Sequence, residues 1–187
     1  VERCRGGGDL GEPRRGEPGG RAGRHRRADG EPRRLHRRRR GWGDALVFWG
    51  EDKRKRRMSH GQLYLEVARL AAALRSLGVV AGDRVAAYMP TLPETLIAML
   101  AASSIGAIFT SASPDFGVQG VLDRFGQTEP KVLFAGDGYF YNGKTIDSMA
   151  KVAEIAAQMP SLQKLVVVPY VHATHDLSGL PCGTMLD

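Results

Sequence analysis

The chain has 187 residues, enough for one ordinary hydrophobic core, and a formal net charge of +7 that is confined to one end. Residues 1–43 carry fourteen arginines against six acids, a balance of +8, whereas residues 44–187 carry thirteen Lys and Arg against fourteen acids, a balance of −1. The longest uncharged stretch, 95–113, is interrupted by Ser103, Ser104 and Gly106 and falls short of the ~20 apolar residues of a membrane span.

Residues 1–43 form an Arg- and Gly-rich segment that we expect to be disordered. They include eleven Gly but no Lys, Ser, Thr, Ile, Phe or Tyr. Such a segment cannot bury enough apolar surface to offset its chain entropy. Two interpretations stay open: a basic arm that binds nucleic acid through phosphate contacts, or an out-of-frame translation of GC-rich DNA, which the composition favours. This stretch also lacks the apolar core of a signal peptide.

The first half of the globular part predicts alternating strands and helices. Residues 45–49 are typical of a short buried strand, and 50–57 of a polar hairpin turn. A capping box of Ser59 and Gln62 begins a helix that Gly78 ends. A strand over 84–89 precedes a second capping box, Thr91 with Glu94, and a helix over 92–104 that is apolar on most sides.

The second half repeats this order. Residues 105–110 and 131–135 read as strands around a helix that Asp115 caps and Pro130 terminates. Residues 139–143 indicate a strand and a tight Asn-Gly turn, 146–158 a helix, and 164–168 a β-branched strand. Residues from Pro169 onward are interpreted as a loop.

Strands and helices in this alternation predict an α/β fold, with a mostly parallel sheet covered by helices on both faces. Ligands of such sheets bind beyond the carboxyl ends of the strands, where residues 110–115 and 135–138 are expected. Neither segment is a phosphate loop, because the sequence contains no G-x-x-x-x-G-K-[ST] and no G-x-G-x-x-G pattern.

Candidate catalytic residues are few, and none is assigned a catalytic, cofactor-binding or metal-binding role. His172, His175 and Asp176 could be imagined as a metal cluster, but two exposed loop histidines explain them better, since zinc needs at least three protein ligands. Thr110, Ser111 and Ser113 have no recognisable base partner. Asp115 and Asp137 are interpreted as cap and turn residues. Cys4 and Cys182 lie at opposite ends without metal-ligand spacing or a disulfide framework, which indicates a reduced, cytoplasmic setting.

Three stretches carry a family resemblance: residues 45–52, 113–131 and 137–144. The amino-acid sequence of these stretches is similar to that of the acetoacetyl-CoA synthetases, in the acyl-CoA synthetase branch of the adenylate-forming enzymes. The resemblance implies an acid–thiol ligase (acetoacetate–CoA ligase) of lipid metabolism that uses ATP, Mg and coenzyme A. It also implies that residues 44–187 are a partial N-terminal AMP-binding domain, because the family's phosphate loop and catalytic Lys have no counterpart among them.

The leading hypothesis is therefore an N-terminal fragment of an acetoacetate–CoA ligase that is inactive by itself and contains no cofactor site. The intact enzyme would bind small molecules (acetoacetate, ATP and CoA), and no membrane is expected among its partners. Two alternatives stay open: a small basic nucleic-acid-binding protein with an α/β body, which we favour less, and a non-functional product of a damaged gene.

Overall fold

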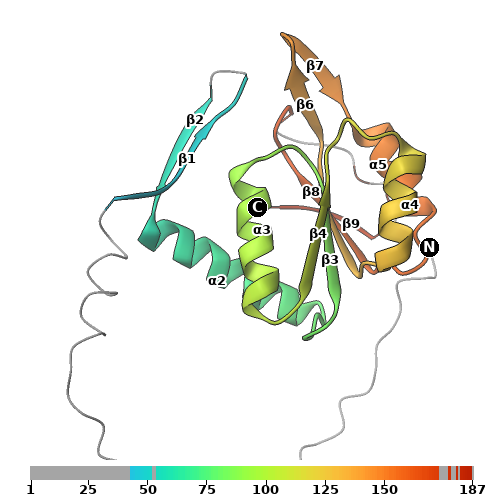
Figure 1. Cartoon of the computed structure of the whole chain (residues 1–187), viewed down its shortest axis with the longest axis horizontal. Helices are drawn as coiled ribbons and strands as arrows, with labels where there is room; N and C mark the ends of the chain where they lie inside the picture. The colour runs from blue at the N-terminus through green and yellow to red at the C-terminus, as the bar shows by residue number, and fades with distance from the viewer. Residues whose placement is uncertain (1–42, 52–53, 173–176, 178–179, 181, 187) are drawn as a thin grey trace, which may run out of the picture.

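A computed structural model describes residues 43–51, 54–172, 177, 180 and 182–186. The interpretations of residues 1–42, of His175 and of Asp176 concern positions outside these described residues. The centre of the fold is a five-stranded sheet in which every neighbouring pair is parallel. Its order is β4 (Ile108–Ala112), β3 (Arg84–Tyr88), β5 (Val132–Gly136), β8 (Lys164–Val168) and β9 (Gly183–Met185) (Figure 1). The predicted α/β class is confirmed.

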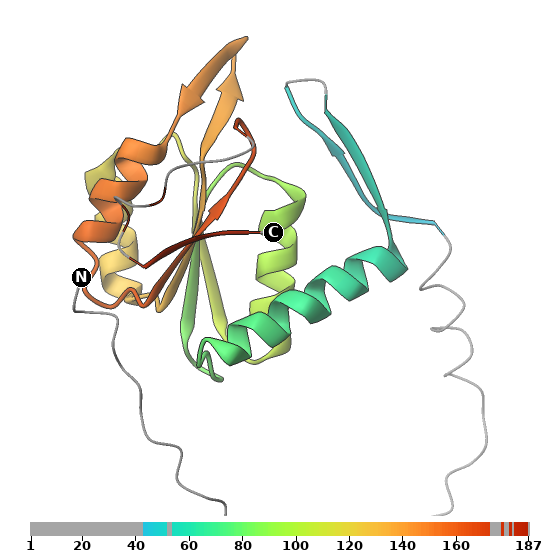
Figure 2. The ribbon, with the colours of Figure 1, turned by 180° about the vertical axis from the view of Figure 1, so that it is seen from behind.

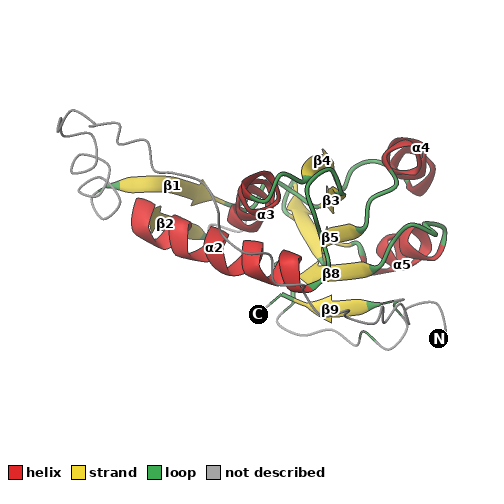
Figure 3. Cartoon of the chain, turned by 90° about the horizontal axis from the view of Figure 1, so that it is seen from below, coloured by secondary structure: helices red, strands yellow, loops and turns green. Residues whose placement is uncertain are grey.

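Two pairs of helices cover the two faces of this sheet (Figure 3). One face packs against α2 (His60–Ser76) and α3 (Pro93–Ser104), the other against α4 (Val118–Thr128) and α5 (Met149–Ala157). Strand β5 shows the division, because Val132 and Phe134 lie in the first core and Leu133 and Ala135 in the second. A strand buried on both faces must be apolar throughout, which is why β5 and β8 were predictable as continuous hydrophobic runs.

The start of α2 follows its sequence. Ser59 Oγ accepts the Gln62 N–H at 3.2 Å, and Gln62 Oε1 accepts the Ser59 N–H at 2.8 Å, so the predicted capping box is confirmed. Gly78 has a φ of +76° directly after the helix, the left-handed conformation expected there.

The second predicted capping box is wrong. Helix α3 has Leu92 at its N-cap and Pro93 in its first turn. The Oγ1 atom of Thr95 accepts the Leu92 N–H and donates to the Pro90 carbonyl. Thr95 therefore makes the capping hydrogen bond that was expected of Thr91 and Glu94. Glu94 is instead paired with Arg56, in the strand Lys55–Ser59.

Two antiparallel hairpins stand outside the main sheet, the first leading into α2 and the second following β5 (Figure 2). The first joins β1 (Asp44–Trp49) to β2 (Lys55–Ser59), which corrects two expectations. Strand β1 is not buried in the sheet, since Val47 and Trp49 are 55% and 71% exposed, and the turn is shorter than 50–57 because residues 55–57 belong to β2.

The second hairpin joins β6 (Gly138–Tyr141) to β7 (Lys144–Asp147). Its turn is the predicted Asn-Gly pair, with φ of +50° at Asn142 and +71° at Gly143. Because residues 144–147 pair as β7, helix α5 begins at Met149 rather than at Ile146.

The end of the described chain also departs from expectation. Residues 183–185 form β9 beside β8, where only a loop was predicted, because a three-residue strand is too short to show a periodic pattern. Cys182, expected to be reduced, is disulfide-bonded. Within the described ranges, each helix is too short or too polar to cross a bilayer.

Candidate functional site at the carboxyl edge of the sheet

The carboxyl ends of β3, β4, β5 and β8 lie at the same edge of the sheet, where the chain passes from β5 into the β6–β7 hairpin (Figures 1 and 2). A cavity of about 330 Å³ opens there between the hairpins and the loops that follow β3 and β4. Its polar lining includes Glu51, Ser113 and Asp115. Six of its fourteen lining residues are aromatic: Phe48, Trp49, Tyr139, Phe140, Tyr141 and Tyr170. The arrangement therefore suits a group with flat or apolar surface.

Asp137 is the buried acid of this edge, with no exposed surface. Its Oδ1 accepts the backbone N–H groups of Tyr170 (2.8 Å) and Val171 (3.0 Å), and its Oδ2 accepts those of Val171 (3.1 Å) and His172 (2.8 Å). Three successive amides that point at one carboxylate form a compact anion site inside the protein. The Asp137 side chain thus holds the turn after β8, and the sequence offered no signal for a contact across 33 residues.

The loop after β4 is built on Tyr88. The hydroxyl of Tyr88 lies 2.8 Å from the Phe116 carbonyl and 3.0 Å from the Pro114 carbonyl, and burial raises the pKa of this tyrosine to about 12. Ser113 Oγ donates to Asp115 Oδ2 at 3.0 Å. Asp115 does not cap α4, as was expected, because Gly117 occupies the N-cap position.

Tyr139 connects this loop to the second hairpin. Its ring is almost fully buried. Burial, and then the neighbouring Asp115 carboxylate, raise the pKa of Tyr139. Thr110 and Ser111, the other hydroxyl candidates, lie within β4 itself rather than in the loop beyond it.

Of the histidine candidates, His172 is the one that lies among the described residues. The side chain of His172 is about half exposed, with Nε2 3.9 Å from Asp147 Oδ2. In the part of the chain that the structure describes, no three His, Cys, Asp or Glu residues are grouped so as to hold a metal ion.

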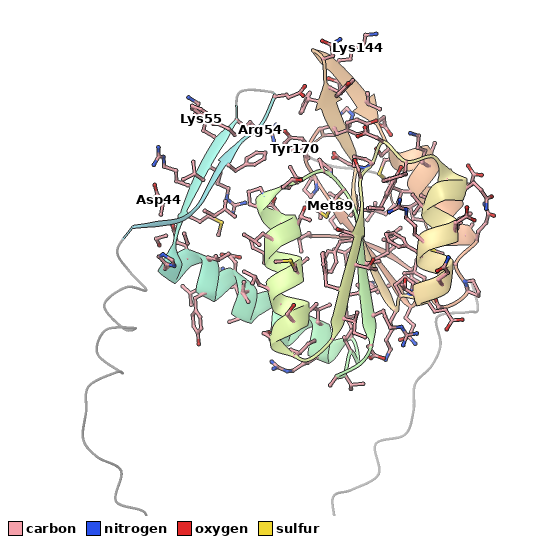
Figure 4. All side chains as sticks on the ribbon, viewed as in Figure 1. Asp44, Arg54, Lys55, Met89, Lys144 and Tyr170 are labelled. Atoms are coloured by element: carbon pink, nitrogen blue, oxygen red, sulfur yellow. The ribbon has the colours of Figure 1, made fainter. Side chains whose placement is uncertain are left out.

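Tyr170 connects the two hairpins at this site. Its ring packs edge-on against Phe48 of β1, with centroids 6.3 Å apart, and against Phe140 of β6 at 5.2 Å. Arg54 places its guanidinium carbon 5.8 Å from the Tyr170 ring centroid and donates from Nη1 to the Tyr170 carbonyl at 3.1 Å. Tyr170 and Arg54 lie near each other between the hairpins in Figure 4.

The tips of the hairpins are also joined. The Asn142 N–H, in the turn of the second hairpin, donates to Glu51 Oε2 in the turn of the first, at 3.0 Å. Neither this bond nor the Tyr170 cluster follows from any motif, because the contacts of the first hairpin with Asn142 and Tyr170 join residues about ninety or more positions apart.

The fold and its matches define the class of protein. Residues 35–181 match the family model described as AMP-binding enzyme, which covers most of the chain, so the chain belongs to the AMP-binding enzyme family. This confirms the resemblance to adenylate-forming enzymes.

Proteins similar to this chain include several that are named acetoacetyl-CoA synthetase. The protein of that name from Rhizobium meliloti (strain 1021) is 54% identical over 130 residues, 70% of this chain and 20% of the relative. The one from Macaca fascicularis is 49% identical over 128 residues, 67% of this chain and 19% of the relative. The solved acetoacetyl-CoA synthetase from Streptomyces lividans superposes with a TM-score of 0.71 at 40% identity, over 76% of this chain and 21% of its own. The chain therefore spans about a fifth of the length of the relatives it matches.

Proposed function

We propose that this chain is part of an acetoacetate–CoA ligase. In that reaction the carboxylate of acetoacetate attacks ATP to give an acyl-adenylate and pyrophosphate, and the thiol of coenzyme A then displaces AMP to give acetoacetyl-CoA. The observation that carries the proposal is the 54% identity to a relative named for this activity, together with the matching fold.

Within that enzyme, we propose that residues 44–187 form the first part of the AMP-binding domain and that residues 1–43 stay outside its core. The change in composition at residue 43 supports this division. With a reductant present in both samples, a chain that begins at Gly43 should then melt at the same temperature as the full chain. A cooperative loss of structure on removing residues 1–42 would contradict the division.

The role proposed for residues 44–187 is structural support of the adenylation site rather than the chemistry itself. Transfer of a nucleotidyl group depends on preorganised donors and cations around the phosphates. The sequence contains no glycine-rich phosphate loop with a following Lys or Ser/Thr, and no Lys or Arg is among the described residues that line the cavity at the carboxyl edge. We therefore expect the chain alone to lack acetoacetate-dependent exchange of pyrophosphate into ATP.

The test replaces the matched segment of the Rhizobium meliloti acetoacetyl-CoA synthetase with residues 44–187 of this chain. The chimera should make acetoacetyl-CoA and should prefer acetoacetate to acetate, because the fold and about half of the residues are the same. A matched chimera that carries the corresponding segment of the Macaca fascicularis relative controls for the junctions. If that control is active and the chimera with this chain folds but is inactive, the proposal fails.

A further inference from the structure

A single buried carboxylate supports the connection between the two hairpins. The side chain of Asp137 accepts the N–H groups of residues 170–172. Its backbone continues into β6, and its own carbonyl accepts the Ser148 N–H at 2.9 Å, at the end of β7. Asp137 therefore holds the base of the second hairpin with its backbone and the turn after β8 with its side chain.

That turn orients Tyr170, and Tyr170 contacts both hairpins. With its backbone N–H bound to Asp137, the ring is fixed where Phe48 of the first hairpin and Phe140 of the second pack edge-on against it. Arg54 binds the Tyr170 carbonyl from the first hairpin. The same three aromatic residues line the cavity of about 330 Å³ at the carboxyl edge.

We infer that Asp137 is a positioning residue that, through Tyr170, sets the separation of the β1–β2 and β6–β7 hairpins and hence the shape of the cavity between them. The inference does not depend on the proposed ligase activity. It predicts an order of action: Asp137 fixes the turn, the turn fixes Tyr170, and Tyr170 fixes the hairpins.

Hydrogen exchange of the full 187-residue chain tests this order. In Asp137→Asn, an amide N–H₂ replaces one acceptor oxygen and faces a backbone N–H, while the backbone bonds of residue 137 remain. The amides of residues 170–172 should exchange at least about tenfold faster, because charge-assisted hydrogen bonds are lost. The ladder amides of both hairpins should also exchange faster, whereas those of β3 and α4 should not change.

Tyr170→Leu separates the effect of Asp137 on the turn from the effect of Tyr170 on the hairpins. It also tests the inference if the Asp137 variant does not fold. Without the ring, the hairpin amides should exchange faster while residues 170–172 stay protected by Asp137. In the double variant, Asp137→Asn should add nothing to the hairpin exchange already caused by Tyr170→Leu, since the first acts through the second.

Asp123→Asn is the matched control, because Asp123 is exposed on α4 and accepts a hydrogen bond from Gln119 of the same helix. It should leave both hairpins unchanged. Faster exchange spread evenly over β3, α4 and the hairpins in Asp137→Asn would mean a general loss of stability and would overturn the inference. So would faster exchange at residues 170–172 with unchanged hairpins, or additive effects in the double variant.

Discussion

Replacing Gly138 by alanine should destabilise the protein, because the added Cβ atom would clash with its neighbours. Gly138 is buried where β5 passes into β6, and it pairs with Asp147 in the hairpin ladder. A Cβ added there would lie 2.4 Å from the Ile146 carbonyl oxygen and 2.9 Å from Val171 Cγ2. The first contact is with backbone, which cannot rotate away as a side chain can.

Overpacking of this kind costs about 1–3 kcal/mol. A domain of this size loses about 2–4 °C of melting temperature for each kcal/mol, so Gly138→Ala should melt about 2–12 °C lower. The shifted β7 backbone and Val171 should also disturb the turn that Asp137 holds.

Gly126→Ala is the control for this substitution. Gly126 lies in α4, where an added Cβ meets nothing within 4 Å. Alanine is the better helix former by about 0.5–1 kcal/mol, so this variant should be slightly more stable than the parent. Both are measured by thermal and urea unfolding. A Gly138→Ala variant that melts at or above the parent temperature would refute the steric reasoning, because it would mean that the β7 backbone moves aside without cost.

Two further substitutions have measurable outcomes. Ser59→Ala removes the α2 cap and should cost about 1 kcal/mol in urea unfolding, whereas Ser59→Asp, which can also accept the Gln62 N–H, should restore most of it; equal stability of all three would contradict the role of the cap. Burial raises the pKa of Tyr88 from 10.0 to about 12, so the folded state favours the neutral phenol. The contribution of this phenol to folding stability is therefore complete below pH 10 and is lost as the pH rises towards 12. Tyr88→Phe should therefore lose less stability between pH 9 and pH 11 than the parent, and an unchanged difference would count against burial of this hydroxyl.

Local patterns predicted most of the elements, because their causes lie within a few residues. The capping box at Ser59, the left-handed Gly78 and the Asn142–Gly143 turn depend on bonds or backbone angles that neighbouring residues determine, and all three are present. The cap of α3 shows the limit of such reasoning. Thr91 and Thr95 both carry a hydroxyl oxygen that could accept a free N–H at the helix start, and in the structure Thr95 accepts the Leu92 N–H.

Strand pairing was less predictable. The apolar run of β1 reads like a buried strand, yet it pairs with β2 outside the main sheet and leaves Trp49 exposed, with Lys55 Nζ 4.2 Å from its ring centroid. Hydrophobicity shows that a strand has an apolar face but not what will cover it. Strand β9 exists because β8 offers an open edge to residues 183–185, which have little strand signal of their own.

By itself, the amino-acid sequence determined the α/β class, the positions of the long helices and core strands, and the resemblance to the acetoacetyl-CoA synthetases, since each rests on periodicity or on residues adjacent in the chain. Only the tertiary structure decided the candidate site. Asp137 and Tyr170 stand 33 residues apart, and Phe48 lies far from both. They meet because parallel strands end at one edge of the sheet, and a buried carboxylate there needs donors that the turn after β8 happens to supply.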